Sequence, residues 1–210
     1  MPPDERPIPR FIAEPPQEAI AYGRWAETLA SHFLEACRRI ETEEDLGEPG
    51  EVTWFPDRTW GGRTYMPATA PTSNGYELFG YVSFTREHEG AQATDFAALA
   101  DWTDETAEAN PDWELDLSDQ EIATWRGPQG RRGDIALVWG VALTQNGVVA
   151  TAELGPITTD QCAIVEDRFT LVSLDAYTGD YLEVVLWGSD GREIAAESLY
   201  ADEDEEEDEG

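Results

Sequence analysis

Carboxylates dominate the side chains of this chain that could do chemistry. Between Arg86 and Arg126 the sequence holds twelve Asp and Glu residues and neither Lys nor Arg. Within this segment Asp112, Glu114 and Asp116 alternate along the chain. In a strand they would lie on one face, where like charges repel unless a cation sits between them. These three residues are therefore candidate ligands for a weakly bound Ca²⁺ or Mg²⁺ ion.

The same stretch does not fit the calcium-binding loop of an EF-hand. Leu117 stands where that loop needs glycine, and Ala123 stands where it needs the closing glutamate. Two other interpretations stay open: a solvated acidic face, and a pair of catalytic carboxylates like that of a glycosidase. A sugar site would also need aromatic rings, for which Trp54 and Trp60 are candidates, although core packing explains such rings equally well.

Histidine and cysteine chemistry has little support. The chain contains only two histidines, His32 and His88, and two cysteines, Cys37 and Cys162. These numbers exclude a His-rich zinc site and a disulfide framework, and we expect both thiols to be buried. No CxxC, GxSxG, GxGxxG or HExxH motif occurs in the sequence. We therefore predict no cofactor beyond the possible divalent cation, and no catalytic residue is assigned.

The net charge of −32 indicates the kind of partner. All 13 basic residues are arginines, and removing the eight carboxylates of residues 201–210 still leaves −24. A surface of this sign repels nucleic acid and anionic membranes and attracts basic proteins or cations. We therefore expect a basic protein partner and no direct contact with nucleic acid or membrane. Adaptation to a high-salt cytoplasm is an alternative explanation of the same charge.

Candidate partner-binding residues belong to the acidic middle segment, to an arginine-rich loop and to the acidic tail. The loop, "WRGPQGRRGD", is the local exception in the charge pattern, and its guanidinium groups could grip carboxylates of the tail or of a partner. A plain solvated loop is the alternative. The candidates are Asp101, Asp104, Glu105, Glu108, Arg126, Arg131, Arg132, Asp202, Glu203 and Asp204.

Two helices are expected to support these residues. The first should run from about residue 16 to 45, because prolines suit its first turn and an apolar residue recurs every three or four positions. The second should begin with Thr94 as N-cap and end before Asn110-Pro111. The first stripe consists of Tyr22, Trp25, Leu29, Phe33, Cys37 and Ile40, and the second of Phe96, Leu99, Ala100 and Thr103.

Strand signals fill the rest of the chain. Residues 51–55, 62–66 and 76–85 are rich in aromatic and β-branched residues, and the segment from Ile135 to Leu143 is apolar on both faces, which favours a central strand. Asn146-Gly147 predicts a tight turn between paired strands. Further turns are expected around Thr178-Gly179 and at residues 189–191. Consecutive hairpins of this kind predict an antiparallel sheet.

The sequence thus predicts an α+β fold, in which a long N-terminal amphipathic helix packs on a mainly antiparallel sheet and a second short helix is inserted midway. Residues 1–14 are expected to form a Pro-rich extended leader, residues 15–200 a single domain and residues 201–210 a disordered acidic tail. No signal peptide or apolar run of ~20 residues is visible, so the cytoplasm is the expected compartment.

The favoured function is a non-enzymatic binding or inhibitor protein, of the immunity type or a polyanion mimic, that engages a basic partner. The alternatives are a carboxylate-dependent enzyme, or a carbohydrate-binding module that uses Trp, Asp and Glu. A protein whose acidity serves only a high-salt cytoplasm is a further alternative.

Overall fold

The computed structural model describes residues 20–88, 90–127, 130–177 and 179–199. Within these ranges a single α-helix, α1 (Gly23–Cys37), is followed by strands only. The strands are β1 (Thr53–Trp54), β2 (Arg58–Trp60), β3 (Arg63–Pro71), β4 (Glu77–Thr85), β5 (Thr94–Thr103), β6 (Leu115–Arg126), β7 (Arg132–Ala142), β8 (Gly147–Leu154), β9 (Ile157–Ala163), β10 (Arg168–Leu174), β11 (Ala176–Tyr177), β12 (Asp180–Gly188) and β13 (Glu193–Ser198).

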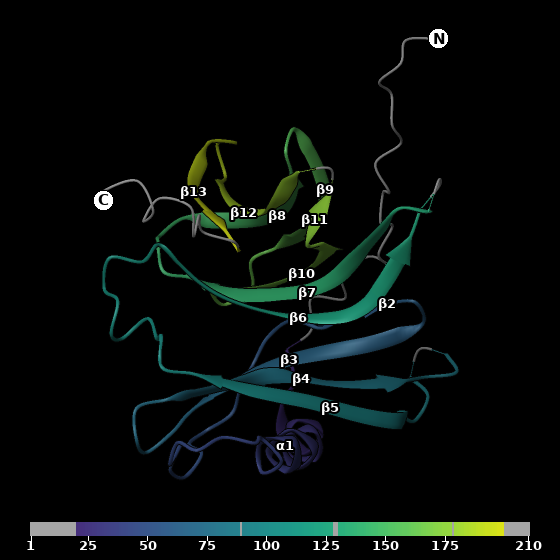
Figure 1. The fold of residues 1–210 in the computed structure, drawn as a ribbon, viewed down its shortest axis with the longest axis vertical. Helices are drawn as coiled ribbons and strands as arrows, with labels where there is room; N and C mark the ends of the chain where they lie inside the picture. The colour runs from purple at the N-terminus through teal and green to yellow at the C-terminus, as the bar shows by residue number, and fades with distance from the viewer. Residues whose placement is uncertain (1–19, 89, 128–129, 178, 200–210) are drawn as a thin grey trace.

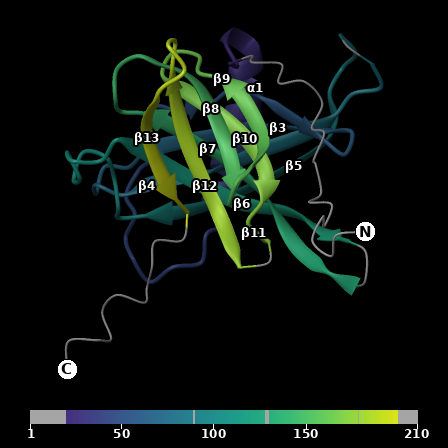
Figure 2. The same ribbon diagram turned by 90° about the horizontal axis from the view of Figure 1, so that it is seen from above.

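The strands form three antiparallel sheets stacked in layers. The first sheet has the order β1-β3-β4-β5, with β2 paired to β3; the second has the order β10-β7-β6. The third has the order β11-β12-β8-β9, with β13 paired to β12. Figure 1 shows α1 against the outer face of the first sheet, and the second sheet between the first and the third. In Figure 2 the strands of the third sheet cross those of the first at a steep angle.

Two apolar clusters hold these layers together. One joins α1 to the first sheet and includes Leu29, Phe33 and Phe84. The other fills the space on both sides of the second sheet, and Trp139 of β7 and Leu186 of β12 belong to it. The segment from Ile135 to Trp139 is almost completely buried, as expected for a central strand covered on both faces. The second sheet is thus the middle layer of the molecule.

The predicted second helix is wrong, because residues Thr94–Thr103 form β5. Exposure alternates along β5, and the partly buried Phe96, Ala98, Ala100 and Trp102 pack against the cluster beneath α1. The alanine-rich composition of this segment favours a helix intrinsically. Pairing with β4 and burial of alternate side chains override that preference, because a strand places every second residue on the apolar layer.

The first helix is shorter than predicted. It covers Gly23–Cys37 rather than residues 16–45, of which 16–19 lie outside the described residues. Leu29, Phe33 and Cys37 of the predicted stripe are buried, whereas Tyr22 is exposed. Beyond Cys37 the sequence carries Glu41 and further carboxylates through residue 45. Negative charge is unfavourable at the carboxyl end of a helix dipole, which is a physical reason for the early stop.

The fold is therefore mostly antiparallel sheet with one helix in the described residues, and the α+β prediction is corrected accordingly. The turn at Asn146-Gly147 exists, with Asn146 at φ 76°, but it joins β7 of the second sheet to β8 of the third rather than two paired strands. The turn at residues 189–191 does join a paired hairpin, β12 and β13. The predicted leader and acidic tail lie outside the described residues.

Candidate functional site

Carboxylates gather at one end of the stacked first and second sheets. Glu77, which begins β4, pairs in register with Thr103, which ends β5. The chain then leaves β5 and enters β6 on the same side of the molecule, on the left in Figure 1. We call this region the acidic end. Its carboxylates are Glu44, Asp45, Glu77, Asp101, Asp104, Glu105, Glu108, Asp112, Glu114, Asp116 and Glu197.

Three of these carboxyl groups come from different sheets, and the charge of one, Asp116, acts on the other two. Asp116 of β6 pairs with Val141 of β7 and so shares the face of Trp139, which contacts Phe79 of the first sheet. Burial and the charge of Asp116 raise the pKa of Glu77 from 4.5 to about 7. Burial also raises the pKa of Asp116. Ionisation of these carboxyl groups is therefore less favourable at the acidic end than in water.

Glu197 brings the third sheet to the same place. Burial, then the charges of Asp116 and Glu114, raise the pKa of this β13 carboxyl group. Tyr76, which directly precedes β4, donates a hydrogen bond from its hydroxyl group to Glu44 Oε2 at 3.3 Å. The charge of Glu44, followed by burial, that hydrogen bond and the more distant charges of Asp104 and Asp45, raises the pKa of the Tyr76 phenol. Carboxylates from segments far apart in the sequence thus contribute to the electrostatic potential at the acidic end.

The acidic end lacks an internal counter-charge within the described part of the chain. None of its carboxylates forms an ion pair there with an arginine. The described residues also contain no group of three or more His, Cys, Asp or Glu side chains arranged to hold a metal ion. Of the candidate ligands Asp112, Glu114 and Asp116, only Asp116 lies within β6, so the expected alignment on one strand face does not form.

The structure separates the two described groups of candidate partner-binding residues. Asp101, Asp104, Glu105 and Glu108 are all exposed and lie at the acidic end. Arg126, Arg131 and Arg132 lie at the other end of β6, in the hairpin that leads to β7. Arg131 donates a hydrogen bond to the hydroxyl oxygen of Tyr177 at 2.7 Å, while Arg126 and Arg132 are exposed. Residues 202–204 lie outside the described residues.

A second polar feature is a buried ion pair between Arg58 of β2 and Asp160 of β9. Asp160 also accepts a hydrogen bond from the backbone N–H of Val172 in β10, at 2.8 Å. Burial raises the pKa of Asp160, and Arg58 and the backbone donors oppose that rise. The Nε and Nη1 groups of Arg58 have no hydrogen-bond partner among the described residues. This pair fastens the first sheet to the third.

Neighbouring hydrogen bonds extend that fastening. Thr170 Oγ1 donates to the carbonyl oxygen of Pro56 at 2.6 Å, and Arg168 Nη1 donates to that of Trp54 at 3.0 Å. Residues 54–58 therefore act as a strap from the first sheet to β9 and β10.

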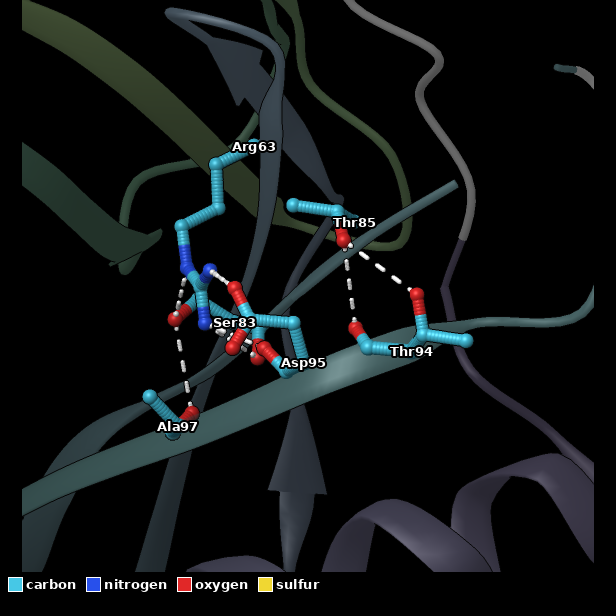
Figure 3. A network of polar contacts seen from close by, with 6 residues as sticks. All are labelled: Arg63, Ser83, Thr85, Thr94, Asp95 and Ala97. Atoms are coloured by element: carbon cyan, nitrogen blue, oxygen red, sulfur yellow. Dashed lines mark hydrogen bonds and ion pairs between the residues drawn. The ribbon is translucent and has the colours of Figure 1, made fainter. Parts of the chain in front are cut away.

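The third polar feature surrounds Arg63 and is shown in Figure 3. Arg63 Nη1 binds Asp95 Oδ2 at 2.6 Å, and its Nε donates to Ser83 Oγ at 2.9 Å. Asp95 has a positive φ of 53°, and the pairing of β4 with β5 shifts register between Ser83 and Thr85. This shift is a β-bulge, which commonly re-aims or ends strand pairing. Arg63 thus clamps the bulge at the start of β5.

A cavity of about 460 Å³ lies beside α1 and is lined by Leu34, Cys37, Leu46 and Leu78 among others. Adjacent strand residues point to opposite faces, so Glu77 lies on the other face from Leu78 and outside this lining. Both cysteines are buried, and burial raises the pKa of the Cys37 thiol to about 11. A thiol held protonated in this way is a poor nucleophile.

The aromatic residues considered for a sugar platform take part in the core. Trp54 is buried and packs edge-on against Phe33, with ring centroids 6.3 Å apart. Trp60 packs against the cluster around the second sheet. Core packing therefore accounts for the burial of Trp54 and for the partial burial of Trp60.

Sequence reasoning missed Glu77, Glu197 and the Arg58–Asp160 pair. The sequence does place Glu77 and the apolar Leu78 on different faces of a strand, because successive side chains of a strand point to opposite faces. Its meeting with Asp116 and Glu197 depends on how three sheets stack, which no local pattern records. The same is true of Arg58 and Asp160, which lie 102 positions apart.

Comparison with protein-family models, with curated proteins and with solved structures finds no significant match for this chain. No helix in the described ranges is both long enough and apolar enough to span a membrane. Inferences about function therefore depend on the chemistry of the acidic end.

Proposed function

We propose that this protein is a non-enzymatic binding or inhibitor protein that engages a basic protein partner through its acidic end. The proposal includes immunity-type inhibitors and polyanion mimics, acting in the cytoplasm. The observation that carries it is the crowding of Glu77, Asp116 and Glu197, which have raised pKa values and no ion pair with a described arginine. A cation from a partner would relieve this repulsion.

The use of arginine inside the molecule supports the proposal. Arg58 is buried against Asp160, Arg63 clamps Asp95, and Arg168 binds the carbonyl oxygen of Trp54. These bases serve the fold rather than neutralise the surface. A chain of net charge −32 therefore presents a strongly negative field outward, which speeds encounter with basic partners and disfavours acidic ones.

Affinity capture with charge-neutralised variants tests this proposal. The test variant combines Asp104→Asn, Glu105→Gln, Glu108→Gln and Asp112→Asn. The control variant removes equal charge at exposed positions elsewhere, through Glu27→Gln, Glu87→Gln, Asp134→Asn and Glu193→Gln. Each immobilised protein is exposed to the same native lysate, at low and at physiological salt.

We expect the wild type and the control variant to retain the same basic protein, and the acidic-end variant to lose it. Equal recovery by the two variants would show that net charge alone attracts partners, and the acidic end would then have no special role. Once the captured protein is purified, its affinity should rise with pH through about 7, because a bound cation favours ionised Glu77.

A further inference from the structure

The outer edge of β5 is open among the described residues. In the first sheet β5 is the last strand of the order β1-β3-β4-β5, and it pairs only with β4. In Figure 1 no other strand runs along its outer side. An edge strand presents a row of unpaired backbone N–H and C=O groups, which can pair with a strand from another chain.

The clamp around Arg63 confines the irregular part of this edge to its first residues. The bulge involves Asp95, and regular pairing with β4 resumes at Ala97 and continues without a shift to Thr103. Arg63 also donates to the carbonyl oxygen of Asp95 at 2.5 Å, so both the side chain and the backbone of the bulge are held (Figure 3). The segment from Ala97 to Thr103 therefore pairs regularly with β4 and can serve as a template for an added strand.

The side chains along this template have two characters. Ala97, Leu99 and Asp101 are exposed, and they lie on the face turned away from α1, because Phe96 and Trp102 pack toward the helix cluster. Leu99 is 42% exposed. Along the chain, the exposed face of the template therefore begins with small and apolar residues and ends with Asp101. The exposed carboxylates of the acidic end follow directly after it.

We propose that the edge of β5 from Ala97 to Thr103 takes up an extended basic segment of the partner as an added strand. An apolar residue of that segment packs on Leu99, and its Lys or Arg side chains face Asp101 and Asp104. This inference rests on the proposed function, because it specifies how the basic partner docks. A second copy of this chain is the wrong occupant, since two chains of charge −32 repel each other.

The test uses a labelled synthetic peptide of repeating Val-Val-Lys-Lys as the probe. In a strand this repeat places valine and lysine in turn along the same face, as Leu99 and Asp101 require. The control peptide has the same sequence with every backbone amide N-methylated, so it keeps its charge and side chains but cannot donate backbone hydrogen bonds. Binding is followed by fluorescence anisotropy, and hydrogen exchange of the full-length protein reports on β5. We expect the unmodified peptide to bind about tenfold more tightly or better, because strand addition depends on several backbone hydrogen bonds.

Two substitutions locate the binding. Leu99→Arg should weaken the unmodified peptide about tenfold by removing an apolar contact and repelling lysine. Val148→Arg adds the same charge at a residue of similar exposure, 40%, on β8, and should change little. In the wild-type protein the amides of residues 97–103 should gain protection when the peptide binds, a readout that requires no variant.

Each result decides between the two proposals. Equal affinity for both peptides, without protection at residues 97–103, would overturn strand addition and leave the proposed function standing. Failure of both peptides to bind would also overturn strand addition, and the capture experiment with the acidic-end variants would judge the proposed function separately. Equal weakening by Leu99→Arg and Val148→Arg would show attraction by overall charge rather than docking on β5.

Discussion

At the scale of single residues, Glu77 contributes to the dependence of stability on pH. Its pKa rises from 4.5 in the unfolded chain to about 7 in the folded protein, so the folded state holds this proton more tightly. The associated stability is present at low pH and is lost as pH rises through 7. We therefore expect a lower thermal midpoint at about pH 8 than at about pH 6, measured by circular dichroism.

Glu77→Gln should raise the midpoint at the higher pH and flatten this dependence, because the amide is neutral at both pH values. Glu121→Gln on β6 serves as a control, since that carboxylate is exposed. An unchanged pH profile in Glu77→Gln would assign the dependence to other groups.

Loss of the buried ion pair between Arg58 and Asp160 should strongly lower the free energy of unfolding. Asp160→Asn leaves a guanidinium group that is almost fully buried without its counter-charge. Breaking one side of such a pair costs about 3–5 kcal/mol of the free energy of unfolding, measured by urea denaturation. Asp190→Asn removes the exposed pair with Arg192 and should cost less than about 1 kcal/mol. Similar losses in the two variants would mean that Arg58 finds other acceptors.

At the scale of elements, the contact of β4 with β5 depends on Gly80. A Cβ atom at this position would lie 2.1 Å from the backbone oxygen of Leu99 and 2.8 Å from Ala100 Cα. Gly80→Ala should therefore force the two strands apart and destabilise the protein by about 1–3 kcal/mol in urea denaturation.

Gly188→Ala on β12 is the matched control. Its new methyl group would meet the exposed side chain of Asp190 at 3.1 Å, which can move aside. We expect a change within about 0.5 kcal/mol. Equal tolerance of both substitutions would show that β5 can shift without loss of pairing.

Elements with a local signature were predictable from the sequence, and elements chosen by tertiary contacts were not. The apolar stripe through Leu29 and Phe33 identified α1, and the doubly apolar segment from Ile135 identified β7 as a central strand. The helix prediction for β5 is wrong because the alanines of this segment favour a helix. Its pairing with β4, which selects the strand, has no signal in the local sequence. Of the acidic end, the sequence predicts Asp101 and Asp104 as partner-binding residues, whereas Glu77 and Glu197 join them only through the stacking of the sheets.

At the scale of the whole molecule, the charge of −32 predicts a response to salt. Screening relieves repulsion between carboxylates that lack counter-charges, so the thermal midpoint should rise when NaCl increases from near zero to a physiological concentration. Choline chloride should give the same rise if screening is the cause. A rise with NaCl alone would indicate specific binding of sodium, and no rise with either salt would mean that the surface charges are already compensated.

The strap of residues 54–58 also determines when a growing chain can complete this molecule. Its bonds reach residues that lie 102 and 114 positions further along, in β9 and β10. A ribosome releases α1 and the first sheet well before those strands exist, so the face that carries Phe55 and Tyr65 stays in contact with water until the strands arrive. Closing so long a loop slows folding, and during that interval a chaperone has an apolar surface to hold.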